Sequence, residues 1–214
     1  MKNRIRLNDR GLTLIELLIG LVICAMVVAG IYRLFIAQSR AYTVQDQVVE
    51  VQQNIRSAME VMLRDLRMTA FDDDRTPLVT VAQPALDPGD NSIKVRYELN
   101  NAPYEVRYWL DGAMNLWRTE TTSTGSNAEE ILENVEALNF TYGVDENEDG
   151  AMDDRNANGQ LDDWVASGSI GTLKVVSVRV SLTARPTQTS PDVQNVTPRT
   201  LISAITFRNL SLMR

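Results

Sequence analysis

The densest group of side chains able to do chemistry lies between residues 145 and 163, where eight carboxylates stand against one cation, Arg155. Oxygen-bearing side chains occupy the first, third and fifth positions of a short motif, and a glycine follows at the sixth. The motif occurs twice, nine residues apart, as Asp145, Asn147, Asp149 and Gly150, then as Asp154, Asn156, Asn158 and Gly159. This spacing wraps oxygen ligands around a hard cation, and the glycine allows a sharp turn.

Calcium is the cation that the spacing favours, as one or two ions, because magnesium prefers fewer protein ligands and more water. The remaining ligands would be the backbone carbonyls of Ala151 and Gln160, with closure by Asp153 or Asp154 in the first copy and by Asp162 or Asp163 in the second. The motif is not an EF-hand, since the twelfth positions hold Asn156 and Val165 instead of a glutamate. The alternative is a solvated acidic loop that binds no metal.

Composition excludes several kinds of catalysis. The 214 residues contain no histidine and one cysteine, so a Ser-His-Asp unit, a histidine-bound zinc and an intrachain disulfide are all impossible. The net charge of −7 argues against nucleic acid as a partner. Paired carboxylates can perform acid–base chemistry, but catalytic pairs usually converge in an apolar cleft, and these crowd one hydrophilic loop. The sequence therefore predicts a protein that is not an enzyme.

An apolar stretch runs from Leu12 to Ala37 and contains only two charges, Glu16 and Arg33. About 20 helical residues span a bilayer, so a transmembrane helix is predicted over about residues 14–37. The basic residues before it predict a cytoplasmic N-terminus and a C-terminal part on the other side. A secretory signal cleaved near Ala29-Gly30 is the alternative. Cys24 lies within the stretch and is expected to be a small packing residue.

Glu16 is the informative residue of this stretch, because a lone carboxylate in a membrane helix is costly and usually has a partner or a function. The positions three and four residues ahead are Ile19 and Gly20, which offer no cation, so we expect its partner to come from elsewhere. A carboxylate lying at the headgroup interface is the simpler explanation.

The helix is expected to continue to Phe71, as one element over residues 12–71. Beyond the membrane stretch, apolar residues recur at spacings of three and four and predict a face that packs on a globular domain; they are Val44, Val48, Val51, Ile55, Met59, Met62 and Leu66.

Residues 72–214 predict a β-rich domain. Alternating apolar residues predict strands over 93–99 and 104–110, joined by a hairpin at 100–103, and further strands at 114–118, 135–142, 173–182 and 201–208. The polar runs 119–127 and 185–198 predict loops. The aromatic residues of these strands are expected to pack in the core and the sheet, and a ligand platform is the alternative; they are Tyr97, Tyr104, Tyr108, Trp109 and Trp117. An antiparallel sheet on a long helix gives an α+β fold.

The run Arg10-Gly11-Leu12-Thr13-Leu14-Ile15-Glu16, behind a basic leader and before a membrane-length helix, resembles the class III signal of type IV prepilins and type II secretion pseudopilins. The resemblance implies that a prepilin peptidase removes residues 1–11 by cutting between Gly11 and Leu12, and then methylates Leu12, which stands where a phenylalanine is usual. It also implies that the new amine of Leu12 neutralises Glu16 of a neighbouring subunit, since a buried charge is far less costly when it is paired.

The segments 63–68 and 205–210 resemble PilW-like minor pilins, some of which carry a similar acidic loop. The resemblance implies a pilin-like fold and a minor subunit of a type IV pilus that takes part in assembly initiation and the tip complex. Its partners would be other minor and major pilins through the N-terminal helix, the inner-membrane assembly platform and a tip adhesin. It would start in the inner membrane with a periplasmic domain and end in the fibre. The alternatives are a GspJ-like minor pseudopilin of type II secretion and a single-pass anchored binding domain.

Overall fold

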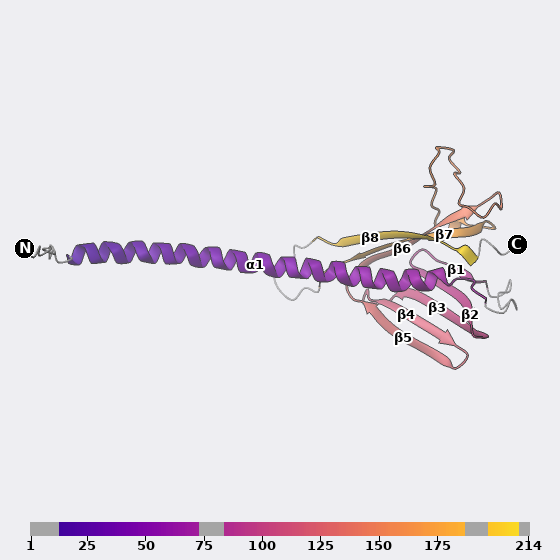
Figure 1. Ribbon diagram of the computed structural model, residues 1–214, viewed down its shortest axis with the longest axis horizontal. Helices are drawn as coiled ribbons and strands as arrows, with labels where there is room; N and C mark the ends of the chain where they lie inside the picture. The colour runs from indigo at the N-terminus through magenta and orange to yellow at the C-terminus, as the bar shows by residue number, and fades with distance from the viewer. Residues whose placement is uncertain (1–12, 73–83, 187–196, 210–214) are drawn as a thin grey trace, which may run out of the picture. The chain divides into compact units, whose positions relative to one another are not determined.

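The computed structural model describes residues 13–72, 84–186 and 197–209, and the predicted cleavage residues Gly11 and Leu12 lie outside them. The chain divides into two compact units, residues 1–46 and 47–214. Helix α1 (Leu14–Arg67, 54 residues) contributes to both of them (Figure 1). It contains no proline, and a turn at residues 68–70 with a positive φ at Ala70 ends it.

The first sheet is antiparallel and has the strand order β1-β2-β3-β4-β5. Its strands are β1 (Leu86–Pro88), β2 (Ser92–Leu99), β3 (Ala102–Leu110), β4 (Leu116–Thr122) and β5 (Gly125–Leu132). The β2–β3 turn uses Asn100 and Asn101, both with positive φ, which asparagine tolerates better than most residues. Alternation along these strands places one set of side chains in the core and the other set on the outer face.

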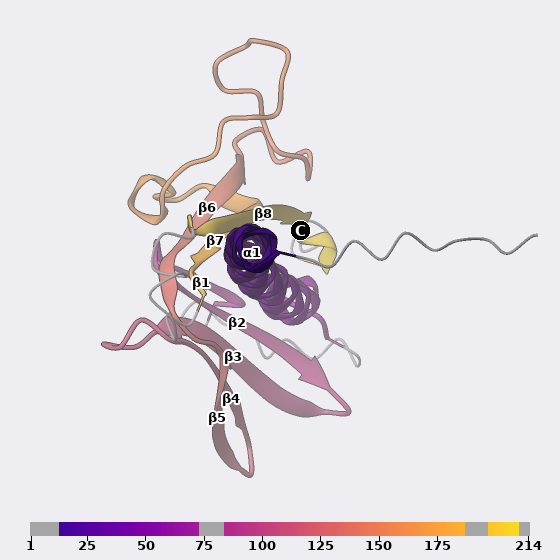
Figure 2. The same cartoon turned by 90° about the vertical axis from the view of Figure 1, so that its left-hand side faces the viewer.

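The second sheet has the order β6-β7-β8 and is also antiparallel. Its strands are β6 (Val135–Asp145), β7 (Lys174–Ala184) and β8 (Arg199–Thr206). The acidic segment and the short 3₁₀ helix η1 (Ser167–Ser169) lie in the connection from β6 to β7, drawn in orange in Figure 2.

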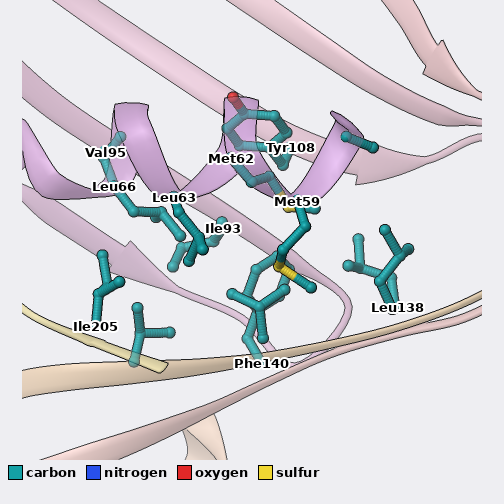
Figure 3. Packing of buried hydrophobic residues seen from close by; sticks show 14 of the residues in the cluster. Met59, Met62, Leu63, Leu66, Ile93, Val95, Tyr108, Leu138, Phe140 and Ile205 are labelled. Atoms are coloured by element: carbon teal, nitrogen blue, oxygen red, sulfur yellow. The ribbon is translucent and has the colours of Figure 1, made fainter. Parts of the chain in front are cut away.

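The core of the second unit joins α1 to both sheets. Met59, Met62 and Leu66 are at most 2% exposed, and they pack into one cluster with Tyr108 of the first sheet and Phe140 of the second (Figure 3). The predicted apolar face of the helix is therefore confirmed from Val51 onward, with Val44 and Val48 half-buried. The α+β pilin-like fold class is confirmed as well.

One predicted loop is a hairpin in the structure, and one strand of the structure was not predicted. The loop predicted over 119–127 is wrong, because β4 and β5 extend through it and turn at residues 123–124. Threonine and serine fill both strand ends and resemble loop composition, although threonine is a good strand former. The short strand β1 was not predicted, and much of the loop expected at 185–198 lies outside the described residues.

Candidate functional site

The start of α1 is a capping box built by Thr13 and Glu16. The Thr13 backbone N–H and hydroxyl donate to Glu16 Oε2 at 2.9 and 2.8 Å, and the Glu16 N–H donates to the Thr13 hydroxyl at 3.3 Å. This reciprocal arrangement satisfies N–H groups that a helix start leaves without intrahelical partners. These hydrogen bonds lie within one chain and supply no cation, so a charge partner of Glu16 from a neighbouring subunit stays a prediction.

The rest of the first half of α1 exposes its apolar side chains. Leu14, Leu21 and Phe35 are 78%, 62% and 66% exposed, and none of the most apolar 18-residue stretch is buried within the protein. By length and composition this helix is able to cross a membrane.

The first acidic motif folds into a turn that directs its oxygens inward. Asp145, at the end of β6, is 2% exposed and accepts the N–H groups of Asp149 and Gly150 at 3.2 and 2.8 Å. Asn147 Oδ1 accepts the Asp149 N–H at 2.9 Å, and Asp149 Oδ1 accepts the Ala151 N–H at 2.8 Å. The side chains at positions one, three and five thus all accept backbone N–H groups of the same turn.

The second motif repeats these bonds nine residues later. Asp154 accepts the N–H groups of Asn158 and Gly159 at 3.1 and 2.6 Å, while Asn156 Oδ1 accepts from Asn158 and Asn158 Oδ1 accepts from Gln160. The backbone repeats as well, since the fourth and sixth positions have positive φ in both copies: 59° and 89° in the first, 55° and 81° in the second. The two copies are therefore one structural motif used twice.

The copies differ in how they close. In the first, Asp153 accepts the Asn147 side-chain amide at 2.9 Å; in the second, Asp163 accepts that of Asn156 at 2.7 Å and Asp162 that of Asn158 at 3.2 Å. The first copy is therefore closed by the carboxylate at its ninth position, Asp153. The second copy is closed by those at its ninth and tenth positions, Asp162 and Asp163.

Arg155, the one cation of the segment, pairs with Glu146 at 2.6 Å. Across residues 13–72, 84–186 and 197–209, no group of three or more aspartate, glutamate, cysteine or histidine side chains gathers closely enough to hold a metal by itself.

A buried polar cluster between α1 and the first sheet was not predicted from the sequence. Asp65 is 3% exposed, and its Oδ2 accepts the Tyr108 hydroxyl at 2.6 Å and Arg118 Nε at 2.7 Å. The remaining guanidinium nitrogens bind Glu120 at 2.6 Å and Glu129 at 3.1 Å. Burial and the adjacent Asp65 carboxylate raise the pKa of the Tyr108 hydroxyl far above its usual range, so it stays a donor.

One signal in the sequence identifies the helical half of this cluster. Asp65 follows Met62 by three residues and Ala58 by seven, which places it on the apolar stripe and not on the charged face. Nothing in the local pattern of β4 indicates that Arg118 meets it, because that contact joins positions 53 residues apart.

Comparisons with known protein families agree with this architecture at both ends of the chain. Residues 6–32 match the prokaryotic N-terminal methylation motif, and residues 103–207 match the family of the type IV pilus-assembly protein W. No curated protein matches the chain. The chain thus carries a prepilin-type methylation motif ahead of a domain that is similar to the pilus-assembly family. Together, the two matches are those of a PilW-like minor pilin with a prepilin signal, and both families are structural pilus components.

Proposed function

We propose that this pilin is a minor subunit of a type IV pilus that acts in assembly initiation and the tip complex. One observation about α1 supports the proposal. Its first part lies in the methylation motif and exposes apolar side chains, and the same helix continues without a break into a part that is buried against the domain matched by the PilW family. Such a subunit is held in the inner membrane with its N-terminus in the cytoplasm and its domain in the periplasm, and then enters the fibre. The PilW match favours the pilus over a type II secretion pseudopilus.

Deletion of the gene tests this role. We expect few or no surface pili, with normal amounts of the major subunit in the membrane, and recovery by the wild-type chain. Unchanged pilus number together with lost export of a secreted enzyme would instead identify a pseudopilin.

The processing step would remove residues 1–11 between Gly11 and Leu12 and methylate the new amine. Methylation keeps the positive charge of that amine, which then lies four residues before Glu16 in sequence. Prepilin peptidase, other pilins, the inner-membrane assembly platform and a tip adhesin are the proposed partners.

Glu16 has two roles to separate, the helix cap and a charge pair with the Leu12 amine of a neighbour. Glu16→Gln removes the charge but keeps a side-chain oxygen that accepts the Thr13 bonds, whereas Thr13→Val removes the hydroxyl of the cap but keeps the charge. If the charge pair drives assembly, Glu16→Gln lowers incorporation into sheared pili and Thr13→Val does not. The reverse ranking would leave capping as the only role. Immunoblots of membranes and a mass spectrum of each variant check that level and cleavage are unchanged.

We further propose that the acidic loop binds calcium. The donor set fits, because carboxylate or amide oxygens at positions one, three and five bond within one turn in each copy. The ligands would come from Asp145, Asn147, Asp149 and Asp153, and from Asp154, Asn156, Asn158, Asp162 and Asp163, with the carbonyls of Ala151 and Gln160. Bound calcium would neutralise crowded carboxylates and hold the loop in one conformation.

Calorimetry of the full chain in detergent tests the loop. We expect saturable heat with calcium, a higher melting temperature with calcium than with chelator, and a smaller effect of magnesium. Two single variants, Asp145→Asn and Asp154→Asn, show how many copies bind. If both copies bind calcium, each variant lowers the number of ions bound per chain by one. A flat titration with an unchanged melting temperature would make this a solvated acidic loop.

A further inference from the structure

The outer face of the first sheet carries two neighbouring tryptophans. Trp109 on β3 and Trp117 on β4 are cross-strand partners, and their rings lie 6.4 Å apart at an interplanar angle of 24°. Their chain neighbours Tyr108 and Arg118 point into the core, so alternation places both indoles on the opposite face, where they are half-buried. The expectation that all the aromatic residues of these strands serve packing holds for Tyr108 but leaves these two rings unexplained.

Both indoles are fixed in place by the protein. Trp109 Nε1 donates to the Thr119 hydroxyl at 3.3 Å, and Trp117 Nε1 donates to Asp111 Oδ2 at 2.9 Å. Asp111 is held in turn by the N–H groups of Ala113 and Asn115, at 2.9 and 2.8 Å through its other oxygen. With their N–H groups bonded inside the chain, the rings have only carbon surface to offer a ligand. Because their orientation is already set, binding costs little side-chain entropy.

The surroundings of the pair are polar and carry both signs of charge. The Arg107 guanidinium lies 5.8 Å from the centre of the Trp109 ring, and Glu130 pairs with Trp117 across β4 and β5. Beside Trp109 opens a hollow of about 590 Å³, whose polar lining includes Asn91, Arg107, Glu136 and Asn139. Hydrogen-bond donors and acceptors thus surround a flat apolar surface.

We propose that this face, defined by Arg107, Trp109 and Trp117 with the adjacent hollow, binds a glycan. A pyranose ring has an apolar C–H face that covers an indole, and each of its hydroxyls both donates and accepts hydrogen bonds. The tryptophans supply the apolar contact, and the arginine, asparagine and carboxylate groups around them supply partners for the hydroxyls. The hollow is within the size range of small-molecule sites.

A protein partner fits this face less well. The centre of a protein interface is depleted of lysine and of carboxylates, yet a carboxylate residue, Glu130, lies directly opposite Trp117 on the outer face. On the same face, Lys94 and Arg96 of the neighbouring strand β2 pair with Glu105 of β3 at 3.4 and 2.7 Å. A ligand that contacts a small apolar area and many polar groups is therefore favoured.

The chain contains a matched control in its third tryptophan. Trp164 is also half-buried and also stacks with an arginine, with the Arg179 guanidinium 4.9 Å from its ring centre, but it follows Asp162 and Asp163 in the acidic loop. Each of three variants therefore removes one indole ring that stacks with an arginine or with another tryptophan: Trp109→Leu, Trp117→Leu and Trp164→Leu. Only the first two should change glycan binding.

The experiment uses the full chain in a detergent without a sugar headgroup, applied to an array of neutral and acidic oligosaccharides. The strongest glycan is then titrated in solution against tryptophan fluorescence. We expect saturable binding, about tenfold weaker in Trp109→Leu and in Trp117→Leu, as the loss of one stacking contact implies, and unchanged in Trp164→Leu. Melting temperatures within a few degrees of wild type show that each variant is folded. Arg107→Gln, which removes no ring, is expected to weaken binding by a smaller factor.

Three results would overturn the proposal. The first is an array on which the wild-type chain binds no glycan more strongly than the double variant that lacks Trp109 and Trp117. Another is binding that survives both single substitutions, and the third is binding lost equally in Trp164→Leu. A blank array combined with crosslinking of the Trp117 face to another pilus subunit would identify a protein interface instead.

Discussion

The two halves of α1 share one helical backbone but differ in what covers their apolar side chains. In the second half, Ile55, Met59 and Met62 are at most 2% exposed because the chain's own sheets cover them. In the first half, Leu21 and Phe35 are more than 60% exposed. Exposing a large apolar side chain to water costs about 1.5–3 kcal/mol. Under the proposed function, lipid or neighbouring subunits bury these side chains, because the described part of the chain does not.

The same contrast holds for the carboxylates of the helix. Asp65 bonds to residues of the sheet far along the chain, whereas the described bonds of Glu16 go to Thr13, at its own end of the helix. Contacts of the second half therefore hold the domain together, and under the proposed function the first half is left for membrane insertion and assembly. Substitutions in the two halves should separate these two properties.

Arg118→Met should have the largest effect on the stability of the domain. It leaves the buried Asp65 carboxylate without its one buried cationic partner among the described residues, a loss that typically costs about 3–5 kcal/mol. Urea unfolding of the full chain in detergent, followed by near-ultraviolet circular dichroism, measures the loss. Arg64→Gln is the control, because Arg64 also pairs with Asp65, at 3.4 Å, but is 69% exposed and should contribute less than about 1 kcal/mol. Equal losses would mean that the buried cluster does not join helix and sheet.

Met62→Ala should destabilise the domain by about 2–5 kcal/mol, because the side chain is fully buried and leaves a cavity. Leu21→Ala removes a similar volume from the first half and should change the same unfolding curve by less than about 0.5 kcal/mol. Leu21→Ala should lower the amount of the subunit in pili even though the stability of its domain is normal. A matching stability loss in Leu21→Ala would remove the distinction between the halves.

A smaller effect is expected in acid, at Asp111. The N–H groups of Asn115 and Ala113 and the Trp117 indole lower the pKa of Asp111 below its usual value. A carboxylate with a lowered folded-state pKa contributes stability above its unfolded pKa of about 3.9, and the contribution disappears as the pH falls through the folded value. Tryptophan fluorescence titrated from pH 5 downward should therefore change below about pH 3.9. Asp111→Asn should remove that transition, and a transition that persists in the variant would assign it to another group.

The features that the sequence predicts correctly depend on local pattern. The membrane-length stretch, the buried stripe from Val51 to Leu66 and the strands with regular alternation all follow from spacing along the chain. The repeated turns of the acidic loop follow from it too, since Gly150 and Gly159 take positive φ at the positions where the motif places them.

The features that the sequence does not predict depend on distant or competing contacts. The Asp65–Arg118 pair joins a helix to a strand, so neither local pattern contains it. The β4–β5 hairpin is hidden because threonines that pair across strands, such as Thr121 with Ser126, look like loop residues in sequence. The two outer tryptophans alternate with buried residues, and only the core positions of Tyr108 and Leu116 fix their face.

Mass spectrometry of the native protein, taken from membranes and from sheared pili, tests the role of the first half most directly. We predict a chain that begins at Leu12 with a methylated amine, in the membrane and in the fibre, and an uncut chain when the prepilin peptidase is absent. A chain that retains Met1 in the wild type, or that begins just after Gly30, would contradict the assignment of this helix to pilus assembly.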